Sequence, residues 1–221
     1  MQDIQDYIFR LLLMIPIAMI SLSVHESAHG YVSYKLGDPT ARNLGRITLN
    51  PFKHFDLIGF ICMVVVRVGW AKPVPVNPRY YKNPRVGMAL TAAAGPVSNL
   101  LLALIGVFGA ELSYRLALTV MANETLVVIV LTVYNFFYLL AFGNISLAIF
   151  NLIPVPPFDG SRILYVFLPP KFYFGIMKYE KYIMIGMLVL VYFGFLDVPL
   201  RLAVNGIYAG MEWLVNLLLI F

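Results

Sequence analysis

Long apolar runs alternate with short polar segments along most of the chain. The first apolar run covers about Tyr7–Lys35, the second about Val86–Ala110 and the third about Leu126–Phe150. Each of them approaches or exceeds the roughly 20 residues that a helix needs to cross the apolar core of a bilayer. The three runs therefore predict transmembrane helices.

Two further apolar runs follow near the C-terminus, at about Tyr182–Leu196 and Leu200–Phe221, with Asp197-Val-Pro199 between them. The whole pattern predicts about five transmembrane helices in an all-α polytopic membrane protein. No internal repeat and no separate soluble segment stands out, so we expect one transmembrane domain over residues 1–221.

The polar region between the first two predicted spans has a different pattern. RITLN, at residues 46–50, favours a β-strand, and the apolar stretch Leu57–Val68 is too short for an ordinary span. WAKPVPVNPRYYKNPR, at residues 70–85, contains four prolines and cannot form a regular helix. We therefore expect a re-entrant or short β element at the membrane edge, followed by extended backbone at the membrane surface.

Composition supports the membrane assignment, because 61% of the residues are hydrophobic, only 12% are charged, and the mean hydropathy is +0.82. Arg10 is the only cationic leader residue of the first run, and no small-x-small cleavage site stands before HESAH, so we interpret that run as a retained span rather than a signal peptide. The single cysteine, Cys62, excludes an intrachain disulfide and a CxxC metal site.

The positive charges are unevenly placed. Nine of the sixteen basic residues lie in residues 35–85, against two acidic ones, Asp38 and Asp56. This bias predicts that the segment faces the cytoplasm of a multi-pass protein of the cell membrane. The segment lacks a basic helix or a basic strand interleaved with aromatic residues, so nucleic-acid binding is not expected. The sparsely basic stretch 111–124 suits a loop on the outer side.

The sequence HESAH places three titratable residues inside the first apolar run. On a helix, His25 and His29 lie one turn apart on the same face and can bind one metal ion together. Glu26 is rotated by about 100°, so it is better placed to act as a general base on metal-activated water. A bound cation also explains why imidazoles stand in an apolar segment. A pair of core histidines bonded to neighbouring helices remains the structural alternative.

A catalytic zinc site needs a third protein ligand, for which His54 and the acidic residues are candidates. Asp159 stands out because it follows the proline-interrupted sequence NLIPVPPFDG at the end of a predicted span. A carboxylate just past such a break can point sideways into a cavity. The alternative is that Asp159 caps a helix beginning near Ser161, or sits in an Asp-Gly turn.

Three elements in order, HESAH, GPVSN (residues 95–99) and NLIPVPPFDG (residues 151–160), resemble the site-2 protease family of intramembrane zinc metalloproteases. The last of them matches the family pattern N-x-x-P-x-P-x-x-D-G. The resemblance implies that His25, His29 and Asp159 are the ligands of one zinc ion per chain and that Glu26 is the catalytic base.

The resemblance also implies that Asn151 lines the site, where its amide could donate to a developing oxyanion, with a helix-end cap as the alternative. Gly95 and Asn99 would lie on the central span, Gly95 allowing close helix approach and Asn99 having a structural role. NPFKHFD resembles the compact subgroup without PDZ or CBS modules, and a membrane-edge structural or gating role is favoured for His54 over metal ligation.

The expected function is hydrolysis of peptide bonds within or near the transmembrane segments of a membrane-protein substrate, in the lipid bilayer, at a site that opens toward the cytoplasm. The extended segment around Val74 and Val76 is expected to pair with the unwound backbone of that substrate. A metal transporter and a catalytically silent scaffold are the competing classes.

Overall fold

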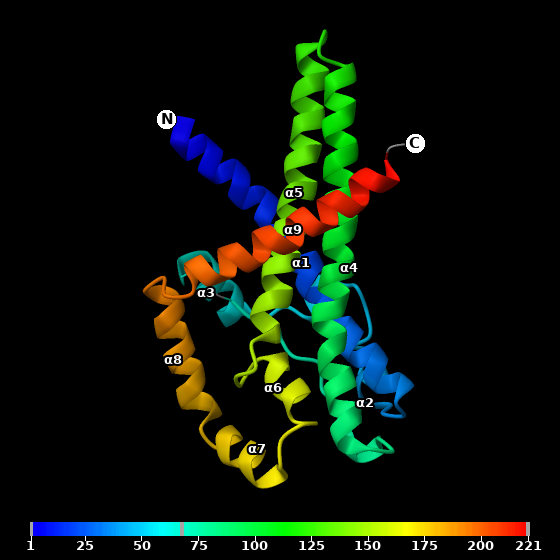
Figure 1. Cartoon of the computed structure of the whole chain (residues 1–221), viewed down its shortest axis with the longest axis vertical. Coiled ribbons are helices and arrows are strands. Elements are labelled where there is room, and N and C mark those ends of the chain that lie inside the picture. Colours follow the sequence, from blue (N-terminus) through cyan, green and yellow to red (C-terminus); the bar gives the residue numbers. More distant parts are fainter. Residues whose placement is uncertain (1, 67–68, 220–221) are drawn as a thin grey trace.

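The computed structural model describes residues 2–66 and 69–219, and in this part of the chain every regular element is helical. Three long helices, α1 (Gln2–Lys35), α4 (Pro84–Thr119) and α5 (Glu124–Leu152), form the central bundle, with α4 packed against both of the others. Helix α9 (Asp197–Leu218) runs obliquely across α4 and α5 (Figure 1). The predicted all-α class is therefore confirmed for the described residues.

Asparagine caps fix where the two central helices begin. The side chain of Asn83 accepts hydrogen bonds from the backbone N–H groups of Arg85 and Val86, and Pro84 occupies the first turn, where a missing N–H costs nothing. Asn123 caps α5 in the same way, through the N–H of Leu126. Helices α4 and α5 are therefore joined by a tight turn at residues 120–123.

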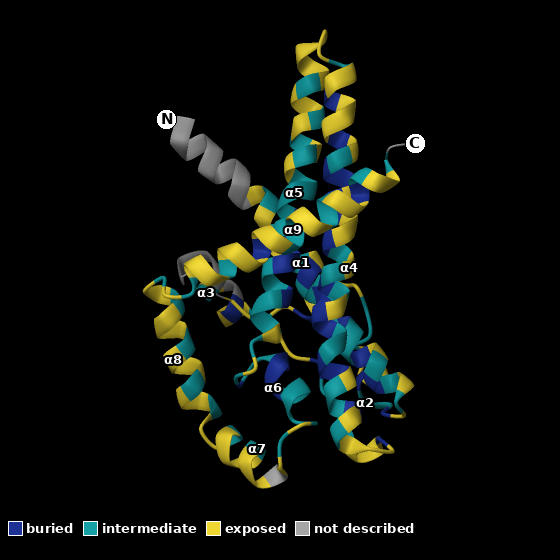
Figure 2. Cartoon of the chain, in the orientation of Figure 1, coloured by how far each residue is buried: buried dark blue, intermediate teal, exposed yellow. Residues whose placement is uncertain are grey.

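Small residues let α4 and α5 approach closely. A Cβ added to Gly106 would lie 2.7 Å from the backbone nitrogen of Ala141, so only glycine fits at this crossing. Two apolar clusters lie beside it, one formed by Ala103, Ile145 and Val204 and the other by Val107, Ala141 and Val215. Many large hydrophobic side chains are exposed on the outside of the helices (Figure 2), as expected for a bundle that faces lipid.

Three helical segments are long and apolar enough to cross a membrane: Leu12–Lys35, Pro84–Thr119 and Glu124–Leu152. Helix α8 (Glu180–Tyr192) and α9 add one more span if the pair is counted as one, although the two are bent by 82°. Gly194, with a φ of 74°, supplies the left-handed residue at this bend. Helix α8 alone covers only about 20 Å, which is too short for a span. The described residues thus contain three or four candidate spans, and the predicted five are not confirmed.

Helix α4 is also longer than predicted, since residues 111–119, expected in an outer loop, continue it. Arg115 does not need a loop, because its guanidinium donates to Oδ1 of Asn216 and to the carbonyl of Leu219 at the end of α9. A charged side chain with such partners is compatible with a helix of the bundle.

The predicted membrane-edge region forms short helices rather than strands within the described residues. They are α2 (Thr40–Asn43), a 3₁₀ turn at Pro51–Lys53, α3 (Leu57–Val66) and a 3₁₀ turn at Pro78–Tyr80. The β-strand predicted at residues 46–50 is absent, and the last two residues of the predicted re-entrant stretch, 67–68, lie outside the described residues. Of the predicted non-helical segment 70–85, residues 70–77 have no regular secondary structure, whereas the rest contains the 3₁₀ turn at Pro78–Tyr80 and, at residues 84–85, the start of α4.

The chain after α5 continues with α6 (Asp159–Leu164) and α7 (Pro170–Met177). The prolines between Leu152 and Asp159 end α5 and return the chain toward the bundle, where α6 packs against α4. This return brings the start of α6 to the C-terminal part of α1, beside His25 and His29.

Candidate metal centre

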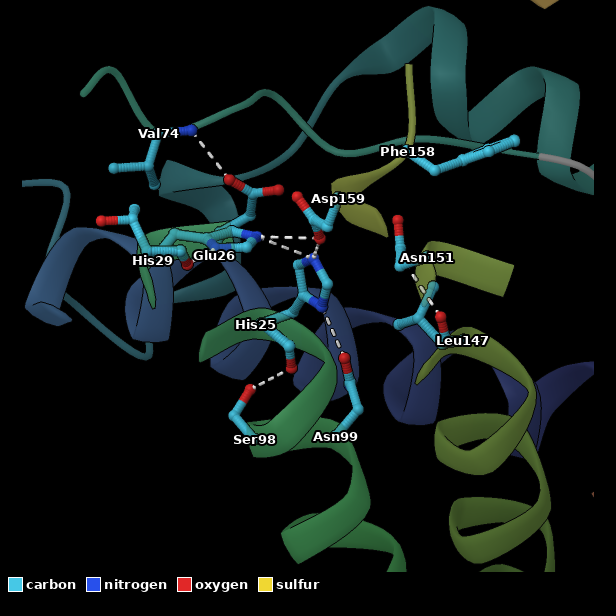
Figure 3. A network of polar contacts seen from close by, with 12 residues as sticks. His25, Glu26, His29, Val74, Ser98, Asn99, Leu147, Asn151, Phe158 and Asp159 are labelled. Carbon is cyan, nitrogen blue, oxygen red and sulfur yellow. Dashed lines mark hydrogen bonds and ion pairs between the residues drawn. The ribbon is translucent and has the colours of Figure 1, made fainter. Parts of the chain in front are cut away.

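Helix α1 presents both histidines of HESAH to the same point inside the bundle. The Nε2 atoms of His25 and His29 are 3.0 Å apart, and the side chains are buried or nearly so (Figure 3). The helical spacing of four residues predicts this arrangement, since both side chains leave the helix on one face.

Asp159 approaches the two imidazoles from α6. Its Oδ2 atom lies 3.2 Å from Nε2 of His25 and 3.3 Å from Nε2 of His29 (Figure 3). It is the first residue of α6, but its side chain makes no capping hydrogen bond there, so the capping alternative is not adopted. Gly160 is required by the same turn, because a Cβ there would collide with the carbonyl groups of Leu152 and Ile153.

The other ring nitrogen of each histidine is a hydrogen-bond donor. Nδ1 of His29 is 2.7 Å from the carbonyl oxygen of Thr91, which can only accept. Nδ1 of His25 is 2.5 Å from Oδ1 of Asn99, whose amide nitrogen donates to Asn144 and to the carbonyl of Ser21. These bonds assign the proton to Nδ1 in both rings and leave both Nε2 lone pairs pointing at Asp159.

This arrangement brings three acceptor atoms together without a donor. The side chain of Asp159 is buried and meets both imidazoles at their Nε2 atoms. Its buried Oδ2 has no hydrogen-bond donor among the described residues. Three converging lone pairs repel one another unless a cation lies between them, which disfavours the interpretation as an ordinary core histidine pair.

The separations fit a tetrahedral ion. Ligands about 2.0–2.1 Å from zinc in tetrahedral geometry are about 3.3 Å from one another, and the three observed separations are 3.0, 3.2 and 3.3 Å. Within the described residues, His25, His29 and Asp159 are the cluster of metal-binding side chains. The residues present therefore fit a zinc ion with three protein ligands and one open position.

Gly95 on α4 provides the space that the imidazoles occupy. A Cβ at this position would lie 2.5 Å from Cε1 of His25 and 2.6 Å from Cε1 of His29, closer than real Cβ contacts allow. Its neighbour Asn99, one turn further along α4, orients His25 from the other side. The close helix approach expected at Gly95 is therefore an approach to the imidazole rings.

Glu26 lies beside this cluster and faces a cavity of about 160 Å³. Its Oε2 atom accepts a hydrogen bond of 2.7 Å from the backbone N–H of Val74, in the extended segment (Figure 3). Asn151 and Arg162 line the same cavity from α5 and α6. Arg162 was not among the predicted site residues, although its position three residues after Asp159 places it on the same face of α6.

Asn151 donates from Nδ2 to the carbonyl of Leu147 across 3.0 Å, so one of its two amide hydrogens is bound within α5 (Figure 3). The second amide hydrogen is not used by any bond of the described residues. The Asn151 side chain is thus held at the cavity wall with one N–H group free to donate a hydrogen bond.

His54 is separate from the metal cluster. It is buried, with Nε2 2.8 Å from the carbonyl of Thr48 and 3.4 Å from Oγ of Ser27, while its own carbonyl accepts from the N–H of Lys72. These contacts join the loop after α2 to α1 and to the extended segment, as a structural role requires.

Comparison with known proteins gives a consistent result. The sequence model described as "Peptidase family M50" matches residues 13–193. The chain is 42% identical over 172 residues to "Putative zinc metalloprotease YwhC" of Bacillus subtilis, covering 78% of this chain and 76% of that protein. It is 26% identical over 178 residues to "Putative zinc metalloprotease Rip2" of Mycobacterium tuberculosis, covering 78% of this chain. This match spans 63% of the Rip2 protein, and no solved structure matches.

Proposed function

This chain belongs to peptidase family M50, and on that premise we propose that it is an intramembrane protease of the site-2 type. It hydrolyses peptide bonds within or near the transmembrane segments of membrane-protein substrates. The observation that carries the proposal is the convergence of His25, His29 and Asp159 inside a bundle of membrane-length helices, with Glu26 facing the same cavity.

Zinc is the metal assigned to this centre, because the relatives described above are named zinc metalloproteases. His25, His29 and Asp159 would hold it, one ion per chain. The chemistry that zinc supplies when bound is Lewis acidity, which makes water acidic enough to attack a carbonyl near neutral pH. The fixed Nδ1 hydrogen bonds keep both imidazoles in the tautomer that such a site needs.

Glu26 acts as the general base and then as the general acid. Its carboxylate takes a proton from the attacking water and passes it to the leaving amine. The hydrogen bond from Val74 fixes Oε2, which leaves the second carboxylate oxygen for proton transfer. The spare amide hydrogen of Asn151 is the donor proposed for the developing oxyanion.

The cavity is bounded on one side by Pro73, Val74 and Val76 of the extended segment. That segment belongs to the basic region that sequence bias assigns to the cytoplasm, so the proposed site opens on the cytoplasmic side of the cell membrane. A transmembrane helix must unwind before its scissile carbonyl can enter, because its backbone groups are bonded within the helix. The extended segment supplies a backbone beside which the unwound strand can lie.

The test compares the native chain with Glu26→Gln in cells of the source organism, by mass spectrometry of new protein N-termini in the membrane fraction. We expect new termini within or near the transmembrane segments of other proteins in native cells. These termini should fall by at least about 100-fold with the variant, which should still bind one zinc. Identical N-termini in both strains would reject proteolysis and favour the transporter or scaffold class.

A further inference from the structure

A second buried carboxylate, Asp38, lies outside the metal centre in the turn that follows α1. Its side chain is inaccessible to solvent. Among the residues that the structure describes, no cationic side chain forms an ion pair with it. Burying an unpaired charge is costly, so the position needs a compensating set of donors.

Four donors surround this carboxylate. Oδ1 accepts from the backbone N–H of Thr40, at 3.0 Å, and from its hydroxyl, while Oδ2 accepts from Oγ of Ser33, at 2.8 Å, and from the N–H of Asn77, at 2.7 Å. Burial alone would raise the pKa of Asp38, but these hydrogen bonds, the Thr40 hydroxyl first, hold it below its ordinary value. The carboxylate is therefore ionised and acts only as an acceptor.

An ionised Asp38 fixes the direction of a chain of hydroxyl groups. The Ser33 hydroxyl donates its only hydrogen to the carboxylate. Its oxygen must therefore accept a hydrogen bond from the Tyr81 hydroxyl, 2.7 Å away. Tyr81 in turn must accept from Oγ1 of Thr91, at 3.1 Å. All donors point toward Asp38, and the linked residues are buried.

The chain ends at a residue that binds a proposed zinc ligand. The carbonyl of Thr91 is the acceptor for Nδ1 of His29, at 2.7 Å. Ser33 lies one turn after His29 on α1. Tyr81, together with Thr91 of α4, therefore connects these two neighbouring turns of α1. Holding Thr91 by its hydroxyl fixes where its carbonyl lies relative to the imidazole.

Asp38 also holds the segment that contacts Glu26. Its bond to the N–H of Asn77 anchors one end of the extended segment, and Arg46 anchors the other by donating to the carbonyls of Lys72 and Pro73. Between these anchors, Val74 donates to Glu26.

We propose that Asp38 is a positioning residue of the metal centre. It acts on His29 through Ser33, Tyr81 and Thr91, and on the catalytic glutamate through the extended segment. It touches neither the metal ligands nor the cavity. The inference rests on the proposed zinc site but not on proteolysis, because zinc affinity in the absence of any substrate tests it.

The experiment measures the zinc dissociation constant of the purified full chain in detergent, by competition with a chelator near neutral pH. Tyr81→Phe removes one oxygen from the chain, and the ring keeps its place because it packs directly on Gly87. Tyr34→Phe is the matched control, since the Tyr34 hydroxyl accepts from Arg42 outside the chain. Asp38→Asn keeps the shape of the anchor and removes its charge.

We expect Tyr81→Phe and Asp38→Asn each to weaken zinc binding about tenfold or more, and Tyr34→Phe to change it less than about twofold. Unchanged affinity in Tyr81→Phe and Asp38→Asn, even with a lower melting temperature, would show a merely structural role and overturn the proposal. If Asp38→Asn weakens zinc binding but Tyr81→Phe does not, the proposed path from Asp38 to His29 through Ser33, Tyr81 and Thr91 is rejected. If Asp38→Asn does not fold, Tyr81→Phe decides the matter by itself.

Discussion

The backbone N–H of Val74 donates to Oε2 of Glu26 across 2.7 Å and joins the extended segment to the helix that carries HESAH. The two residues are 48 positions apart, and no side chain of the segment is needed for the bond. The segment therefore does more than border the cavity: its backbone sets the position of the proposed base, and it does so at the edge beside which a substrate strand is expected to lie.

Replacing Val74 with proline removes the N–H that Glu26 accepts. We expect cleavage of a substrate identified by the N-terminal comparison to fall about tenfold or more, the equivalent of a hydrogen bond to a charged group worth about 1.5 kcal/mol. Zinc content should stay near one per chain, because neither ligand nor ligand-orienting bond is changed. Cleavage rate and zinc content measured on the same preparation check this.

Val76→Pro is the companion variant, because Val76 lines the cavity but makes no bond to Glu26. If the segment pairs with the unwound substrate, Val76→Pro should also reduce cleavage, chiefly through a higher KM. Normal cleavage in Val76→Pro with a loss in Val74→Pro would limit the segment to positioning Glu26, and normal cleavage in both would reject both roles.

The proposed ligand set predicts that zinc content depends on His29 and Asp159 but not on His54. His29→Ala and Asp159→Ala should each retain less than about a tenth of the native zinc, because a tetrahedral site loses one of only three protein ligands. His54→Ala should keep about one zinc per chain, since His54 bonds Thr48 and Ser27 instead. Elemental analysis of the detergent-purified proteins measures this, and loss of zinc from His54→Ala would contradict the ligand set.

Local patterns in the sequence predicted much of this centre. The spacing of His25 and His29 on a helix and the break before Asp159 are local features, so they indicated that these side chains could meet. Helix ends were predicted less well. The stretch 111–124 was expected in an outer loop, but residues 111–119 continue α4, where Arg115 donates to Asn216 and Leu219 of the distant C-terminal region. The strand predicted at residues 46–50 failed for a related reason: tertiary contacts outweigh weak β propensity.

Residues that act through the tertiary fold were not predicted. Thr91 contributes a backbone carbonyl, and Tyr81 a hydroxyl within a chain of four residues, so neither residue type carries a signal of its own. Asp38 looked like one of two acids in a basic segment, and its burial and its four hydrogen-bond donors become visible only in the fold. Such contacts depend on how α1, α4 and the extended segment come together, which no single-sequence pattern specifies.

Gly95 should be intolerant of any side chain. In Gly95→Ala the new methyl group would lie 2.5–2.6 Å from both imidazoles, so we expect zinc affinity to fall about tenfold or more as the rings are displaced. Gly143→Ala is the matched control in the neighbouring helix, because the nearest atom to its added Cβ is 3.9 Å away. Native affinity in Gly95→Ala would show that the rings can move without leaving the metal.

The orientation of the centre in the membrane is testable at two exposed positions on opposite ends of the bundle. Tyr31 lies near the end of α1 that carries HESAH, and Ala122 lies in the turn between α4 and α5. Single cysteines are introduced at each position in a Cys62→Ser background and treated with a membrane-impermeant maleimide. If the basic segment is cytoplasmic, intact cells should label Ala122→Cys, and Tyr31→Cys should react only after permeabilisation. Labelling of Tyr31→Cys in intact cells, with Ala122→Cys protected, would place the cavity on the outer side and remove the basis for a cytoplasmic opening.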